Sequence, residues 1–118
     1  MGIGEEKSFA FAVRVVKAVK ELQVQHREFD LTRQLIRSGT SIGANVSEAQ
    51  KAQSTKDFVS KLGIASKEAE ESRYWIRLLM ATEYMDQTTG KELLDDVDEL
   101  IRILTSSVKT TQRKYLNT

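Results

Sequence analysis

The residues with the most evident chemistry in this sequence are lysines and arginines that recur through its first half. From Lys7 to Arg37 there are seven basic and three acidic residues, a local charge of +4 in a chain whose net charge is +1. Cations grouped on one side of a protein attract phosphate groups. The candidate phosphate-binding residues are Arg14, Lys17, Lys20, Arg33, Arg37 and Lys51. An ordinary solvated face explains the same charges equally well, because no aromatic residues that would stack on bases are interleaved with them.

Other chemistries lack the residues that they require. A di-metal centre in a helical bundle needs Glu-x-x-His pairs, but His26 is the only histidine and Gln23 stands where the glutamate would be. Cysteine is absent, which removes thiolate nucleophiles and Cys-bound zinc. The acidic run Asp95–Glu99 lacks the ligand spacing of a calcium loop, and no glycine-rich loop follows a strand. We therefore expect no enzyme activity, no metal site and no cofactor.

Composition and length predict one all-α domain that spans residues 1–118. The chain has no proline, 7% aromatic and 40% hydrophobic residues, which favours long uninterrupted helices around a single core. No run approaches the roughly 18 apolar residues of a membrane span, and the first residues lack the order of a signal peptide. Without cysteines for disulfides, we expect a soluble protein of the reducing cytoplasm with no membrane partner.

Apolar residues at helical spacing predict four helices. These run from about Glu5 to Gln25, Leu31 to Ala49, Ser54 to Thr82 and Thr89 to Tyr115. Asp30 is expected to cap the second helix, while Ser54 and Thr89 each begin a capping box with an acidic residue three positions later. Because the links are short, the expected fold is an antiparallel up-down-up-down four-helix bundle.

The first and third helices carry more apolar surface than one bundle core can cover. In the first helix, one face is formed by Phe9, Ala12, Val13, Val16 and Val19. Phe11 and Val15 widen this face, and Ile64, Trp75 and Leu78 form a second patch on the third helix, outside its core stripe. We therefore predict contacts between copies of the chain, with Phe11, Val15, Ile64, Trp75 and Leu78 at the interface.

The second predicted helix is rich in small residues, although an interior glycine costs about 1 kcal/mol relative to alanine. Gly39 and Gly43, with Ser41 between them, allow a neighbouring backbone to approach closely. Ser38 and Asn45 lie on the inward side, where polar groups need partners. We expect Asn45 to bond a neighbouring helix and fix its register, with ligand contact in a crevice as the alternative. A helix-turn-helix with Gly39 in the turn is a further alternative, although the apolar phase continues through Gly39.

Two strings in the second and third helices are similar to a known family. The strings are LIRSGTSIGANVSEA, from Leu35 to Ala49, and LGIASKEAEESRYW, from Leu62 to Trp75. On these residues the chain resembles the bacterial four-helix-bundle family named after proteins encoded in intervening sequences of 23S ribosomal RNA genes. The similarity covers almost the whole chain, and Val46 and Ser72 stand where isoleucine and threonine are common in the family.

The resemblance implies an antiparallel four-helix bundle that assembles into a ring-shaped homopentamer. Relatives include accessory proteins of diversity-generating retroelements, which bind nucleic acid and the reverse transcriptase. RNA or DNA binding is thus the leading function that the resemblance implies, and an accessory role beside a reverse transcriptase is its alternative. A purely structural oligomer is the third hypothesis. The motif residues Ser38, Gly39, Ser41, Gly43 and Asn45 are expected to serve folding.

Overall fold

Four long helices make up the structure, a computed structural model that describes residues 2–116. The helices are α1 (Ile3–His26), α2 (Asp30–Ala49), α3 (Thr55–Ala81) and α4 (Gln87–Thr111), and a single π-helical turn, Gln112–Leu116, extends α4. Residues 2–116 contain no strand. The prediction of an all-α fold with four helices is therefore confirmed.

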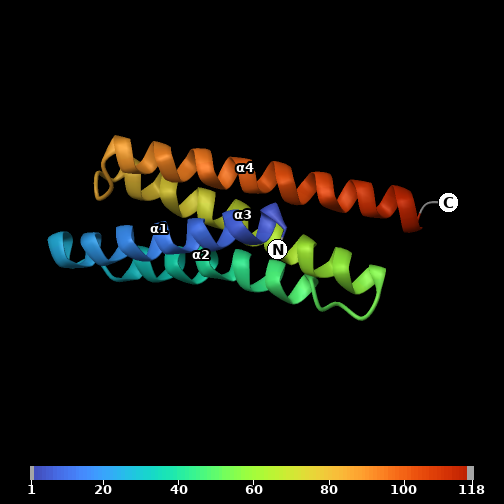
Figure 1. Cartoon of the computed structure of the whole chain (residues 1–118). Coiled ribbons are helices and arrows are strands. Elements are labelled where there is room, and N and C mark those ends of the chain that lie inside the picture. Colours follow the sequence, from blue (N-terminus) through green and yellow to red (C-terminus); the bar gives the residue numbers. More distant parts are fainter. Residues whose placement is uncertain (1, 117–118) are drawn as a thin grey trace.

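The helices run antiparallel to their chain neighbours along a narrow rod of 52 × 22 × 20 Å (Figure 1). α2 packs against α1 and α3, and α4 packs against the same two helices from the other side of the core. The turn between α3 and α4 lies at one end of the rod (Figure 1). The link between α2 and α3 lies at the opposite end, where α4 also terminates (Figure 1).

The predicted cap of α3 is present, whereas the cap of α4 lies three residues earlier than predicted. The Asp57 backbone N–H donates to Ser54 Oγ at 3.0 Å, which is one of the two bonds of a capping box, while the Asp57 carboxylate accepts from the Gln53 backbone N–H at 3.4 Å and not from that of Ser54. In α4 the cap is Asp86, whose carboxylate accepts from the Thr89 backbone N–H at 2.7 Å and from its hydroxyl at 3.1 Å. These bonds, the backbone bond first, hold the pKa of Asp86 below its ordinary value. The prediction of Thr89 as the cap is wrong, because an aspartate one turn upstream already satisfies the first N–H groups.

Glu28 takes the role predicted for Asp30 at the start of α2. Its carboxylate accepts hydrogen bonds from the backbone N–H groups of Asp30 and Leu31, each at 3.0 Å, and of Thr32 at 2.9 Å. A glutamate placed just before the helix has the reach to serve three N–H groups, which an aspartate inside the first turn lacks. The predicted Asp30 cap is therefore corrected to Glu28.

Glycines bring α1 and α2 close together. A Cβ on Gly39 would lie 3.1 Å from both methyl carbons of Val15, and a Cβ on Gly43 would lie 3.4 Å from Ser8 Oγ. At the first of these positions a side chain would require Val15 to shift by a few tenths of an ångström. α2 also continues through Gly39 without interruption, which excludes the helix-turn-helix alternative.

α1 turns a different side to the core from the one that its apolar stripe suggested. Phe11 and Val15 are 1% and 0% exposed, while Phe9 is 71% exposed and Val13 is also exposed. The structure thus corrects the prediction that Phe11 and Val15 face outward to another copy. Periodicity does not fix the orientation of α1, because apolar residues cover more than half of its circumference; the fit of Val15 against Gly39 does.

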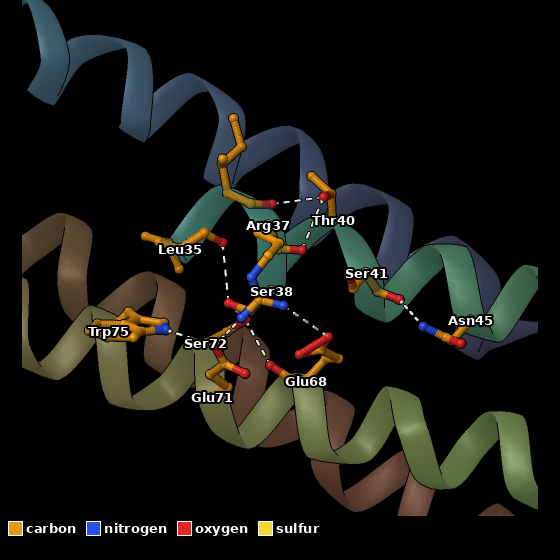
Figure 2. A network of polar contacts seen from close by, with 11 residues as sticks. Leu35, Arg37, Ser38, Thr40, Ser41, Asn45, Glu68, Glu71, Ser72 and Trp75 are labelled. Atoms are coloured by element: carbon orange, nitrogen blue, oxygen red, sulfur yellow. Dashed lines mark hydrogen bonds and ion pairs between the residues drawn. The ribbon is translucent and has the colours of Figure 1, made fainter. Parts of the chain in front are cut away.

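A buried hydroxyl pair joins α2 to α3 (Figure 2). Ser72 Oγ lies 2.8 Å from Ser38 Oγ and 2.9 Å from the Glu68 carbonyl oxygen, and both serines are fully buried. Asn45, which we predicted to bond a neighbouring helix, instead donates to the Ser41 carbonyl of its own helix at 2.9 Å. The buried polar contact between the helices is therefore made by two short hydroxyls, which fit where the backbones lie close together.

Candidate functional site

Two of the six predicted phosphate-binding residues take part in ion pairs between helices. Arg14 of α1 pairs with Asp96 of α4. Arg37 of α2 pairs with Glu68 of α3, at 3.4 Å, and with Glu71 (Figure 2). The Asp96 carboxylate raises the pKa of Arg14, chiefly through its hydrogen bond. Because carboxylates of the same chain partly balance both arginines, these two attract an external phosphate less than unpaired cations do.

The other four predicted cations divide between the two ends of the rod. Lys17 and Lys20 are exposed on α1 and take part in no ion pair among residues 2–116. Arg33 lies 4.0 Å from Asp30, and both side chains are highly exposed, so this pair is weak. The antiparallel register brings Arg33 near the level of Lys20, whereas Lys51 lies beyond the end of α2 at Ala49, which is itself about 24 Å along the helix from Arg33. The six residues therefore do not form one continuous surface.

Arg37 of α2 lies between the carboxylates of Glu68 and Glu71, and these ion pairs link α2 to α3 (Figure 2). Burial raises the pKa of Glu68, the charge of Arg37 opposes this, and the charge of Glu71 adds to it. The Trp75 indole N–H donates to the Glu71 carboxylate at 3.2 Å. The cluster ties the exposed side of α3 to α2 and makes the stability of the bundle sensitive to pH.

An apolar groove runs along the outside of the contact between α1 and α2, and we call it the α1–α2 seam. It has a volume of about 660 Å³. Its lining includes Phe9, Ala12, Thr40, Gly43, Ala44 and Ser47. The four α2 residues in this lining recur at helical spacing and are all small, so the floor is shallow, and the exposed Phe9 ring forms its wall. Periodicity groups Phe9 with the apolar stripe of α1, so this surface could not be predicted from the sequence.

A second apolar surface lies on α3, and we call it the α3 patch; it consists of Ile64, Tyr74, Trp75 and Leu78. Ile64 is 42% exposed and Tyr74 is 57% exposed, while Trp75 and Leu78 are half-buried. Tyr74 and Trp75 pack edge to face with ring centroids 5.1 Å apart. Three of the four residues were identified from the sequence, and Tyr74 was missed because it lies beyond the apolar stripe.

Sites of other kinds have less support in the structure. No group of three or more His, Cys, Asp or Glu side chains among residues 2–116 is placed to hold a metal ion. No helix within the same part of the chain has both the length and the apolar character needed to cross a membrane. The lone His26 packs edge-on against Tyr84 near the turn between α3 and α4, with ring centroids 5.4 Å apart. Charge and exposed apolar surface are therefore the features on which a function can be built.

A comparison with known protein families decides the identity of the family. The family model described as 23S rRNA-intervening sequence protein matches residues 5–106, which include α2 and α3 and most of α1 and α4. The chain belongs to this family. The match agrees with the resemblance found in the strings from Leu35 to Ala49 and from Leu62 to Trp75. In this 23S rRNA-intervening sequence protein, those strings form the close contact between α2 and α3.

A crystal structure from Bacteroides thetaiotaomicron is similar to this 23S rRNA-intervening sequence protein. It is described as a protein with unknown function from the S23 ribosomal protein family. The two chains are 45% identical and superpose with a TM-score of 0.89, over 91% of this chain and 99% of the other. No curated protein matches the chain. Family and fold are thus established together.

Proposed function

We propose that this 23S rRNA-intervening sequence protein is a non-enzymatic, nucleic-acid-binding protein that assembles into a closed ring of identical chains, a homopentamer. The observation that carries the proposal is the pair of apolar surfaces, the α1–α2 seam and the α3 patch, that stay exposed after the core is packed. Exposed aromatic and aliphatic groups gathered on one surface are typical of contact sites between proteins. Contact between copies removes both surfaces from water.

The two surfaces are unlike each other, which favours a ring over a two-fold dimer. The α1–α2 seam is a groove floored by Gly43 and Ala44, and the α3 patch presents the exposed side chains of Ile64 and Tyr74. A contact between two different surfaces is heterologous, so it repeats from copy to copy and closes when the rotation allows. Because both surfaces border α2, this arrangement turns α2 toward the ring axis and α4 toward the outside.

Nucleic acid is the ligand class that the exposed charges support. Lys17 and Lys20 are exposed and take part in no ion pair among residues 2–116. Cations of this kind bind phosphates, and a ring of five copies repeats them, so that weak single contacts combine into useful affinity. The family description names the 23S ribosomal RNA, which makes RNA the first ligand to test.

Mixing two variants, each of which lacks one of the two surfaces, tests the assembly. Phe9→Asp places a charge in the α1–α2 seam and Ile64→Asp places one in the α3 patch, so each variant alone is expected to sediment as a single chain. A mixture is expected to form pairs, because the intact patch of the first variant fits the intact seam of the second. Val24→Asp changes an exposed valine elsewhere on α1 and serves as the control that keeps the full assembly. Rings that survive Phe9→Asp and Ile64→Asp would refute this interface.

A salt titration tests the binding. Labelled RNA should bind at low salt, and its affinity should fall steeply as salt rises, because phosphate contacts release counterions. An affinity that does not change with salt, or the absence of binding at low salt, would overturn the nucleic-acid part of the proposal.

A further inference from the structure

The two halves of α4 carry opposite charge, and the structure accounts for only one of them. Three carboxylates of the first half pair with other helices: Asp96 with Arg14, Asp98 with Arg73 at 2.9 Å and Glu99 with Lys7 at 3.0 Å. From residue 100 to residue 116 the chain has four basic residues and no acidic residue. Carboxylates of the acidic half thus pair with neighbouring helices, whereas the cations of the basic half take part in no ion pair among residues 2–116.

The basic residues of the second half of α4 share one exposed side of the helix, which we call the α4 basic face. Its residues are Arg102, Thr105, Ser106, Lys109, Thr110 and Arg113, and all six are exposed. Together with Ile101 they line one shallow groove of about 460 Å³. From Arg102 to Arg113 the face extends about 16 Å along the helix. It is thus a straight row of three cations with hydroxyl groups between them.

The helix dipole explains only part of this row of cations, because Lys109 lies in the last turn of α4 and Arg102 does not. The stabilisation of cations by a helix C-terminus is limited to about the last turn. Arg102 lies nine residues before the end of α4 at Thr111. Among residues 2–116, Arg102, Lys109 and Arg113 take part in no ion pair. Their charge is therefore available to a partner outside the chain, unlike that of Arg14 and Arg37.

We infer that the α4 basic face is the surface on which this protein binds the phosphate backbone of a nucleic acid, an inference that rests on the proposed function. Arginine, lysine, serine and threonine are the side chains that donate to phosphate oxygens, and here they alternate along one line. In the proposed ring, α4 lies on the outside, where a long polymer reaches it.

The surroundings of the face favour nucleic acid over a lipid membrane. An amphipathic helix that binds membranes inserts an apolar face beside its cations. The apolar side of α4, with Leu93, Val97, Leu100 and Leu104, is instead buried in the core. Two carboxylates lie nearby: Glu70 of α3 lines the neighbouring groove together with Lys67 and Lys109, and Asp98, four residues before Arg102, pairs with Arg73. The remaining lining gives the row a net positive charge.

Two variants with equal loss of charge locate the binding surface. The first replaces Arg102, Lys109 and Arg113 with glutamine, and the second replaces Lys17, Lys20 and Arg33 with glutamine. Each removes three exposed cations from the full chain, so the change in overall charge is the same. The probe is a fluorescent single-stranded RNA of about 20 nucleotides, long enough to cover the face, titrated over a range of salt concentrations.

The first variant is expected to lose at least about tenfold in affinity at low salt, and the slope of log affinity against log salt should fall by about 2 for three lost contacts. The second removes exposed candidate cations of α1 and α2 and should lose much less affinity than the first; an equal loss in both variants would also overturn the α4 assignment. Replacing both arginines with lysine keeps the charge and should keep the binding. Circular dichroism and sedimentation of each variant check that fold and assembly are unchanged.

The outcomes separate this inference from the proposed function. Loss of binding in the second variant but not in the first would overturn the α4 assignment and leave nucleic-acid binding intact. Wild-type protein that binds no RNA at low salt would overturn both. Binding to vesicles of equal parts phosphatidylserine and phosphatidylcholine, without binding to RNA, would show that the face serves a membrane and would also overturn the inference.

Discussion

Replacing Gly39 with alanine should destabilise the bundle, although alanine is the better helix former. The added Cβ would lie 3.1 Å from both methyl carbons of Val15, which is fully buried and, being β-branched, has little freedom to turn away. Helix propensity contributes about 1 kcal/mol in favour of alanine. Overpacking of a core costs about 1 to 3 kcal/mol. We therefore expect the free energy of unfolding to fall by up to about 2 kcal/mol.

A double-mutant cycle read by urea denaturation isolates this contact. In a Val15→Ala background the space above residue 39 is open, so Gly39→Ala should stabilise the protein by about 1 kcal/mol. Gly63→Ala is the matched control, because a Cβ there would meet nothing within 4 Å. It should stabilise the wild-type chain by a similar amount. If Gly39→Ala stabilised the wild type as much as Gly63→Ala does, the close packing of α1 on α2 would be refuted.

Three further predictions concern the polar groups of the bundle. Ser38→Ala and Ser72→Ala should each lower the free energy of unfolding by about 1 kcal/mol, and the double variant by less than the sum, since both lose one shared bond; additive losses would argue against the bond. Because the pKa of Glu68 is raised, the folded chain holds this proton more tightly than the unfolded chain does. The resulting contribution to the free energy of unfolding is fully present below the ordinary glutamate pKa and is lost as pH rises through the raised value. The free energy of unfolding of Glu68→Gln, compared with that of the wild type, should therefore rise over this pH range. Denaturation at several pH values measures the difference between the two proteins, and a difference that does not change with pH would contradict this. The lowered pKa of Asp86 means that its contribution is present above the ordinary aspartate pKa and is lost as pH falls through the lowered value. Asp86→Asn should keep the cap and lose that acid dependence, which thermal unfolding at acidic pH would reveal.

The sequence was sufficient for the helices and for most of the core, because apolar periodicity is a local signal. In α2, Leu35, Ser38, Ile42 and Val46 recur at helical spacing and are buried. In α3 the buried residues at that spacing are Leu62, Ala65, Ala69, Ser72, Ile76 and Leu79. The orientation predicted for α1 was wrong because apolar residues cover more than half of its circumference, so the pattern did not indicate which side faces the core. Its orientation depends on a fit to α2, which only the folded structure shows.

The charges were harder to interpret than the helices. Arg14 and Asp96 are 82 residues apart in the sequence, and no local pattern indicates that they pair. Acidic residues come first along α4 and basic residues last, an order that the helix dipole also favours, so the sequence alone does not separate paired carboxylates from unpaired cations. A charge in a sequence therefore becomes evidence of a binding surface only after the pairs within the fold are known.

The central claim is that the α1–α2 seam of one chain receives the α3 patch of the next, so that the chains close into a ring. Sedimentation velocity of the wild-type protein over a wide range of concentrations tests it most directly. The account predicts one dominant species with five times the mass of the chain. A single compact chain at every concentration would contradict it.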